Sequence, residues 1–362
     1  MSGVTGVPSD YGVFTSLVQD GATVRQRLDQ LTTQAATGLV AQTYGGLGAG
    51  ASTAITLAPQ IANLQTLQSG ISAATGQMQV AQTAMSQIQQ IASNINAALP
   101  DLNGMQPSEV DDIAAQARDA LQQVAGLLNT QDGGIYVFAG ADTANPPVPN
   151  PSSILSSGFY TQIASAVGAL GSAGATATAT AIQTAAASNA AGTSPFSSYL
   201  SQPATTLLSQ APIVQTGPGQ SEVYGFLASA NTASVSSGTY STGSYMRDLM
   251  GALATIGSLS SSQVNLTGFG SLVQDTGAVL SGAIGAMADD AGVLGNRQAA
   301  LTATQSTLSA TQTTLTAQVS GVNTVVAVAG PDAAAGVLPG DRQSRYAFAG
   351  EIPASMTGFT RY

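Results

Sequence analysis

The sequence predicts a mainly α-helical fold in which long helices from both termini pair antiparallel as a coiled-coil rod, with a small β-containing module inserted between them. Two segments, residues 57–99 and 280–326, carry heptad patterns of apolar residues. They lie near opposite ends of the chain, and the residues between them have a different composition. Only 5% of the residues are aromatic and much of the 44% hydrophobic content is alanine, so large apolar side chains are concentrated in the heptads.

The first long helix is predicted over residues 57–99. One apolar column repeats every seven residues from Leu57 to Leu99, and a second column lies three positions later. The pattern holds for about six heptads and is interrupted by Gly70 and Gly76, while Pro59 is expected in the first turn, where proline is tolerated. At about 1.5 Å per residue this helix would be on the order of 60 Å long. It therefore needs a partner of similar length.

The partner is predicted from Leu280 to residue 326. Its first column is apolar, but Gln298, Gln305 and Gln312 fill the middle of its second column. Such a narrow apolar face makes the helix marginal alone, so we expect the two long helices to pack against each other. The residues expected at this helix-packing interface are Leu57, Leu64, Leu67, Ile71, Met78, Met85, Ile88, Ile95, Leu99, Met287, Leu294, Leu301, Leu308, Leu315 and Val322.

Shorter elements complete the expected order. A helix is predicted from Phe14 to Gly38, a glycine-rich loop over residues 43–52, and a helix that begins near Ser108, whose spacing to Asp111 is typical of a capping box. A short strand at residues 135–138 follows, and a helix begins near Tyr245.

Four regions follow from this order: an N-terminal helical region (1–142), an inserted variable module (143–244), a C-terminal helical region (245–328) and an atypical tail (329–362). No charged residue occurs between Asp142 and Glu222, and the inserted segment is rich in Ser, Thr, Ala and Gly. We interpret it as a small, surface-facing module; a partly disordered linker is the alternative.

Composition excludes most catalytic chemistry. The 362 residues include no Cys, His, Trp or Lys, and all eight basic residues are Arg, so there is no thiol nucleophile, no His or Lys base and no His or Cys metal ligand. We therefore expect no enzyme activity, no cofactor and no metal. A net charge of −10 without clustered Arg also argues against a nucleic-acid partner.

Carboxylates are the remaining acid–base candidates, and they occur as adjacent pairs. Asp111 with Asp112 and Asp289 with Asp290 are such pairs. Adjacent residues on a helix point about 100° apart, so neither pair converges on one substrate. The favoured interpretation is a solvated helix face, although a weak cation site stays open.

Three stretches resemble the bacterial flagellin superfamily. Residues 28–38 (LDQLTTQAATG) are similar to the end of its first helix, residues 132–140 (DGGIYVFAG) resemble the Gly-Gly turn and strand of its hook-associated protein 3 branch, and residues 294–297 (LGNR) resemble a passage of its C-terminal helix. The resemblance covers roughly residues 1–145 and 245–328. Its motif residues are Thr37, Gly38, Gly133, Gly134, Tyr136, Phe138, Gly140, Asn296 and Arg297.

The resemblance implies a structural subunit of the bacterial flagellum that joins hook to filament by helix packing after type III export. Implied partners are a hook-side junction protein, flagellin, copies of the chain and an export chaperone, and the implied location is extracellular. Filament flagellin and a non-flagellar secreted coiled-coil fibre or adhesin are the alternatives. Residues 1–14 lack a positive n-region and an apolar h-region, so we expect no Sec-type signal peptide, and no membrane insertion.

The tail departs from the family pattern. The heptads stop after Val326, and Gly and Pro follow where the family continues as a helix. Read one nucleotide later, residues 332–355 can encode an amphipathic helical segment, and Met356 followed by Thr357 forces a stop in that frame because ATG-A contains TGA. We hypothesise that the tail is a frameshift product.

Overall fold

The computed structural model describes residues 11–102 and 107–324. Of the described residues, 69% are helical and 6% are in strands, which confirms the predicted mainly-α class. The chain divides into two compact units. Unit 1 contains the described residues 11–47 and 323–324, and unit 2 is Gly48–Val322. The tail assigned to residues 329–362 lies outside the described residues, and so does its frameshift hypothesis.

Unit 1 is built on one helix, α1 (Tyr11–Thr37). It ends at Gly38, whose φ of 69° lets its N–H donate to the Gln34 carbonyl oxygen at 2.8 Å. The chain then contacts the end of the last helix: Val40 N–H donates to the Asn323 carbonyl oxygen at 2.8 Å, and Ala41 N–H donates to Asn323 Oδ1 at 3.3 Å.

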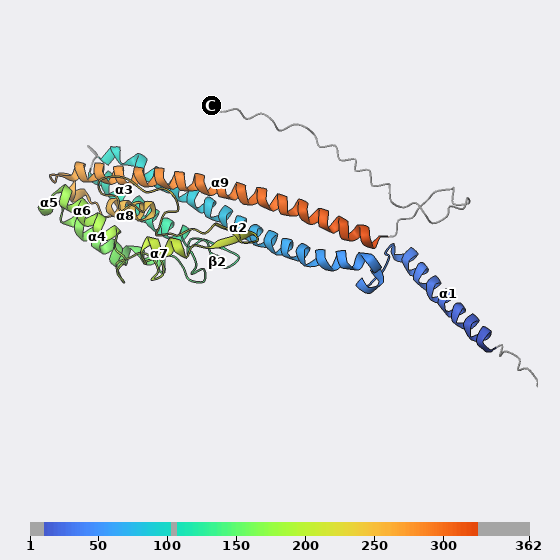
Figure 1. Cartoon of the computed structure of the whole chain (residues 1–362). Helices are drawn as coiled ribbons and strands as arrows, with labels where there is room; N and C mark the ends of the chain where they lie inside the picture. Colours follow the sequence, from blue (N-terminus) through green and yellow to red (C-terminus); the bar gives the residue numbers. More distant parts are fainter. Residues whose placement is uncertain (1–10, 103–106, 325–362) are drawn as a thin grey trace, which may run out of the picture. The chain divides into compact units, whose positions relative to one another are not determined.

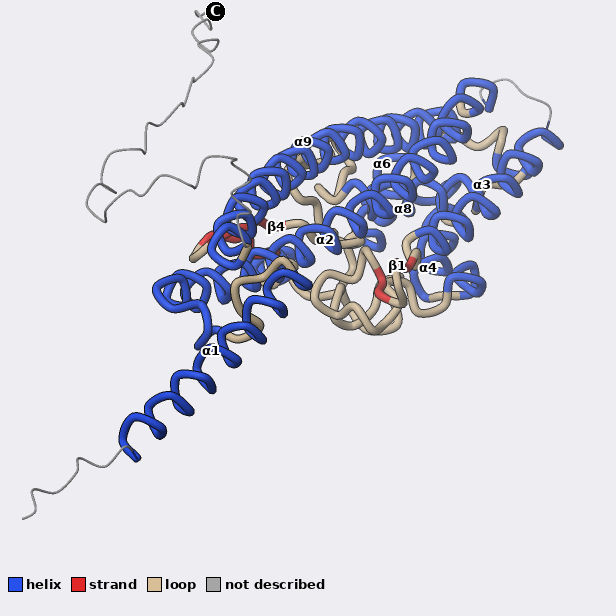
Figure 2. Tube along the Cα trace, turned by 90° about the vertical axis from the view of Figure 1, so that its right-hand side faces the viewer, coloured by secondary structure: helices blue, strands red, loops and turns tan. Residues whose placement is uncertain are grey.

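Unit 2 contains two long helices, α2 (Ala51–Ala98) and α9 (Phe269–Asn323). The last residue of α9, Asn323, belongs to unit 1. The two long helices run side by side in opposite directions in both views (Figures 1 and 2). Close approaches at both ends of the pair agree with this arrangement. Gly50, just before α2, lies so close to Val322 at the end of α9 that a Cβ there would overlap it, and a Cβ at Gly277, near the start of α9, would lie 3.1 Å from Leu99 at the end of α2. The short helix η1 (Tyr44–Gly50) leads into α2.

The remaining elements of unit 2 gather where α2 ends and α9 begins (Figure 1). Most of them are helical, and the strands form two antiparallel hairpins, β1–β2 and β3–β4. In chain order they are η2 (Pro100–Leu102), α3 (Pro107–Leu127), β1 (Gln131–Asp132), β2 (Ile135–Tyr136), η3 (Pro151–Ser156), α4 (Gly158–Gly168), α5 (Leu170–Ala173), α6 (Ala175–Ala186), α7 (Ala204–Ser209), β3 (Ile213–Gly217), β4 (Gln220–Val223), α8 (Tyr245–Gly257) and η4 (Ser261–Gln263).

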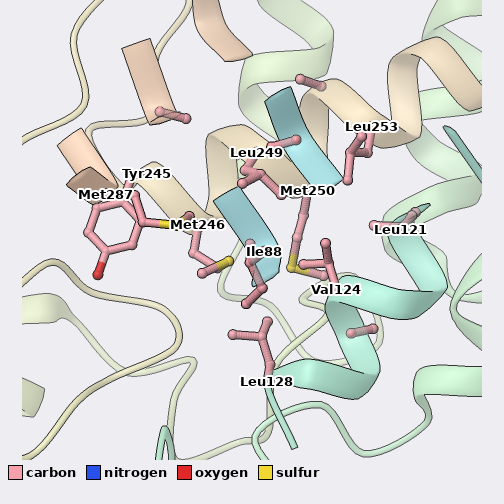
Figure 3. Close-up of a cluster of buried hydrophobic side chains, with 14 of the residues drawn as sticks. Ile88, Leu121, Val124, Leu128, Tyr245, Met246, Leu249, Met250, Leu253 and Met287 are labelled. Carbon is pink, nitrogen blue, oxygen red and sulfur yellow. The ribbon is translucent and has the colours of Figure 1, made fainter. Parts of the chain in front are cut away.

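The core of unit 2 is centred on α8, in which every residue is buried. Figure 3 shows Met250 of α8 near Val124 of α3, and Met246 beside Ile88 of α2. Met287 of α9 is also fully buried. Burying each such side chain contributes about 1.5–3 kcal/mol. Helices far apart in the sequence therefore share one core.

Helices α2 and α9 begin before the predicted residues, and the inserted segment contains helices that the sequence did not predict. Helix α2 begins at Ala51, so Pro59 lies inside it and not in the first turn. Pro59 is exposed, so the carbonyl group that loses its partner can bind water. Residues 143–244 contain the helices η3, α4, α5, α6 and α7 besides the hairpin β3–β4, and the Ala-rich sequence of α6 favours a helix. The coiled-coil packing of the rod and the independent β-containing module stay predictions.

Helix α9 also has the length and hydropathy of a membrane span: its most apolar window has a mean hydropathy of 1.2, and 33% of that window is buried in the fold. Buried core helices of soluble proteins share these properties.

Candidate subunit-packing surfaces

An exposed apolar stripe runs along α1. Phe14, Leu17 and Leu28 are 71%, 67% and 60% exposed. Heptad steps relate Leu17 to Val24 and Leu31, and Phe14 to Leu28, so these side chains share one face of the helix. Exposed apolar residues scattered singly are common, but a stripe along a whole helix is typical of a packing surface.

The interface between α2 and α9 includes hydrogen-bonded polar pairs. Gln298 Nε2 donates to Gln79 Oε1 at 3.0 Å, and Gln305 Nε2 donates to Ser72 Oγ at 2.6 Å. From the first pair to the second, the residue on α9 lies seven positions later in the chain and its partner on α2 lies seven positions earlier, as expected for antiparallel helices. Two of the three glutamines that narrow the apolar face of α9, Gln298 and Gln305, thus bind α2 directly.

Burial of the predicted helix-packing residues changes along this helix pair. Close to the small helices they are buried, and toward the other end they are half-buried, because there the two helices have only each other as neighbours within unit 2. The buried ones are Ile71, Met78, Met85, Ile88, Ile95, Leu99, Met287, Leu294 and Leu301, and the half-buried ones are Leu57, Leu64, Leu67, Leu308, Leu315 and Val322.

The predicted Gly-Gly turn connects β1 to β2. Gly133 and Gly134 have φ values of 57° and 86°, and Asp132 pairs with Ile135 across the hairpin. A two-residue hairpin turn with positive φ at both positions strongly favours glycine. This local geometry explains why the motif carries two adjacent glycines.

The second half of the motif packs on residues 226–228. The Phe138 ring lies edge-to-face with Phe226, with centroids 6.2 Å apart. Gly140 N–H donates to the Phe226 carbonyl oxygen at 3.1 Å, and a Cβ at Gly140 would overlap the Leu227 side chain. Tyr136 is half-buried beside them. The motif therefore connects the N-terminal region to the segment that precedes α8.

The other motif residues lie apart from this hairpin. Thr37 Oγ1 donates to the Thr33 carbonyl oxygen at the end of α1, next to Gly38. On α9, Asn296 is exposed, and Arg297 Nη1 lies 3.5 Å from the Val223 carbonyl oxygen. The structure does not bring the nine motif residues together in one site.

The paired carboxylates do not converge, as their spacing predicted. Asp111 accepts the Ser261 N–H at 2.8 Å, and this hydrogen bond is the main reason that its pKa lies below the usual value. Asp290 is 1% exposed, whereas Asp289 is exposed. The solvated face favoured for these residues is wrong for Asp290.

Sequence reasoning missed the role of Asp290. Its carboxylate accepts N–H groups of Thr232, Ala233 and Ser234, all at 2.8 Å. Burial, with the charge of Asp290 nearby, raises the pKa of Tyr245. A single Asp on a long helix carries no sequence signal for this, because its partners are backbone groups.

Comparison with known proteins gives one match. Residues 16–143 match the bacterial flagellin N-terminal helical region. No curated protein and no solved structure gives a match. The matched residues include most of α1, all of α2 and α3, and the Gly-Gly hairpin. The match covers about a third of the chain and supports its similarity to the bacterial flagellin superfamily.

Proposed function

We propose that the chain is an axial subunit that joins the flagellar hook to the filament after type III export, by packing its helices against neighbouring subunits outside the cell. The observation that carries the proposal is the exposed apolar stripe of α1, which extends from Phe14 to Leu31 of a 27-residue helix. Burying one such leucine in an assembly contributes about 1.5–3 kcal/mol.

The Gly-Gly hairpin supports the junction role over the filament role. The stretch from Gly133 to Gly140 resembles the hook-associated protein 3 branch more closely than filament flagellin, and it packs on residues 226–228. Filament flagellin is the second candidate, because the matched helical region is the flagellin one. A non-flagellar fibre or adhesin is the third.

Complementation separates these candidates. The chain is expressed in strains of its source that lack either the junction protein or flagellin, and filament attachment and motility are scored. Rescue of the junction strain alone supports the proposal. Rescue of the flagellin strain alone contradicts it. Failure to rescue either strain also contradicts it, provided that the chain in which the shifted-frame helix replaces the tail fails as well.

The packing surface is tested by a matched pair of α1 variants. Leu28→Asp places a charge on the apolar stripe, and Gln26→Asp places the same charge on the opposite face of the helix. We expect Leu28→Asp to abolish assembly, and Gln26→Asp to assemble like the parent chain, measured by sedimentation of assembled material. Equal assembly of the two variants would show that the stripe is not a subunit interface.

A further inference from the structure

A cavity of about 330 Å³ lies beside the N-terminus of α8. Its wall includes Ala204 and Leu208 of α7, Asn189 after α6, and Arg247 of α8. Small-molecule sites typically have volumes of about 300–1,000 Å³. The cavity is therefore large enough for a small organic ligand.

Arg247 is the charged group in this wall, and its side chain is 6% exposed. All its hydrogen-bond acceptors among the described residues are uncharged. Nη1 donates to the Ala186 and Ser188 carbonyl oxygens at 3.2 and 3.1 Å, and Nη2 donates to Asn189 Oδ1 at 2.6 Å. The guanidinium carbon also lies 5.1 Å from the centre of the Phe196 ring. Burial lowers the pKa of Arg247 to about 10, so it is positively charged at neutral pH.

The surroundings of Arg247 balance only part of its charge. The carbonyl end of α6, which it contacts, supplies about half a negative charge. The neighbouring Asp248 forms no ion pair with Arg247 among the described residues, since its carboxylate binds the Thr242 N–H and the hydroxyls of Ser241 and Thr242. A buried charge without a full counter-charge is unfavourable. An anionic ligand would supply the missing charge.

The free donors of Arg247 suit a carboxylate. Three of its five N–H groups are used, so Nε–H and one Nη2–H have no partner in the part of the chain that the structure describes. Nε and Nη2 form one edge of the guanidinium, the geometry that binds two carboxylate oxygens together.

The rest of the wall suits a hydroxylated carbon skeleton. The Gln202 amide and Asn189 Nδ2 make no hydrogen bond among the described residues, so they can bind hydroxyl groups. Leu208, Ala204 and Val235 add apolar surface for carbon atoms. One cation, two free amides and an apolar side together match an acidic monosaccharide.

We propose that this cavity binds a sugar acid, with its carboxylate on Arg247 and its hydroxyl groups on Gln202 and Asn189. This site is independent of the helix surfaces that pack subunits together. It would give the chain a carbohydrate-binding activity besides its structural role.

Calorimetric titration of the full chain tests the proposal with glucuronate, glucose and acetate at one ionic strength. We expect saturable binding of glucuronate, at least tenfold weaker binding of acetate, and no saturable binding of glucose. Absence of glucuronate binding overturns the proposal, and so does equal affinity for acetate or glucose.

Three variants locate the site. Arg247→Gln and the cavity-filling Ala204→Phe should each weaken glucuronate binding at least tenfold, whereas Arg27→Gln removes an exposed charge on α1 and should not change it. Ala204 is exposed, so Ala204→Phe keeps the test valid even if Arg247→Gln fails to fold. Binding that survives Ala204→Phe in a folded chain places the ligand elsewhere and overturns the proposal.

Discussion

Gln298 of α9 and Gln79 of α2 form a hydrogen bond between their side-chain amides at 3.0 Å. One heptad later on α9 and one heptad earlier on α2, Gln305 donates a hydrogen bond to Ser72. Both pairs belong to one antiparallel register of the long helices, because the partner on α2 moves back by seven residues as the glutamine on α9 moves forward by seven.

Thiol cross-linking tests this register directly. The chain has no cysteine, so only introduced residues react. We expect a short bifunctional thiol reagent to connect Ser72→Cys with Gln305→Cys in high yield. The pair Ser72→Cys with Gln298→Cys is the matched control, since its members are about 10 Å further apart along the helix axis. Comparable intramolecular yields for both pairs on denaturing gels would contradict a single register.

Gly140 is predicted to tolerate no side chain. Gly140→Ala adds a Cβ that overlaps Leu227, at a φ of 66° that disfavours alanine. We expect the free energy of unfolding in urea to fall by about 2–4 kcal/mol, from overpacking together with backbone strain. In Gly126→Ala the new methyl group meets open space on helix α3, so stability should rise by about 0.5–1 kcal/mol. Equal unfolding midpoints for the two variants would refute the argument.

Heptad periodicity was sufficient to predict the two long helices, but not where each begins. Helix α9 begins at Phe269 and not near Leu280, because its first turns pack Leu272 and Val273 into the core beside α8 and not onto a heptad partner. The Gly-Gly turn was predictable because its φ values require glycine. Local patterns of this kind are visible in a sequence.

The helices between residues 143 and 244 were not predictable in the same way. The residues of α6 are mainly Ala and Thr, with little contrast between apolar and polar positions, and it is packing on α4 and α8 that selects one face. Arg247 and Asp290 gave no signal either, since their partners are backbone groups and one amide side chain, which no spacing in the sequence reveals.

Asp111 should make the stability of the folded chain depend on pH in the acidic range. Its folded-state pKa lies below 3.8, mainly because it accepts the Ser261 N–H. Asp111 therefore binds a proton more readily in the unfolded chain than in the folded one. Its contribution to the free energy of unfolding is fully present above its unfolded-state pKa and is lost as the pH falls through its folded-state pKa. We expect Asp111→Asn to lower the melting temperature at pH 6 and to differ little from the parent at pH 2.5.

Asp112→Asn is the control for this measurement. It removes the same charge from the same turn of α3, and Asp112 is exposed. Its difference from the parent should change little over the same pH range. An Asp111→Asn curve that runs parallel to the parent curve down to pH 2.5 would show that the Ser261 contact does not contribute to acid sensitivity.

Asp290 should be the carboxylate on which unit 2 depends most. In Asp290→Asn one amide oxygen replaces two charged ones, so at least one of the three N–H groups of residues 232–234 loses its acceptor in a buried site. We expect a loss of about 2–4 kcal/mol in unfolding free energy, because unpaired buried donors are costly. The exposed Asp289→Asn should change stability by less than about 0.5 kcal/mol. Amide exchange at residues 232–234 should accelerate only in Asp290→Asn, and unchanged protection there would mean that the carboxylate does not hold this loop on α9.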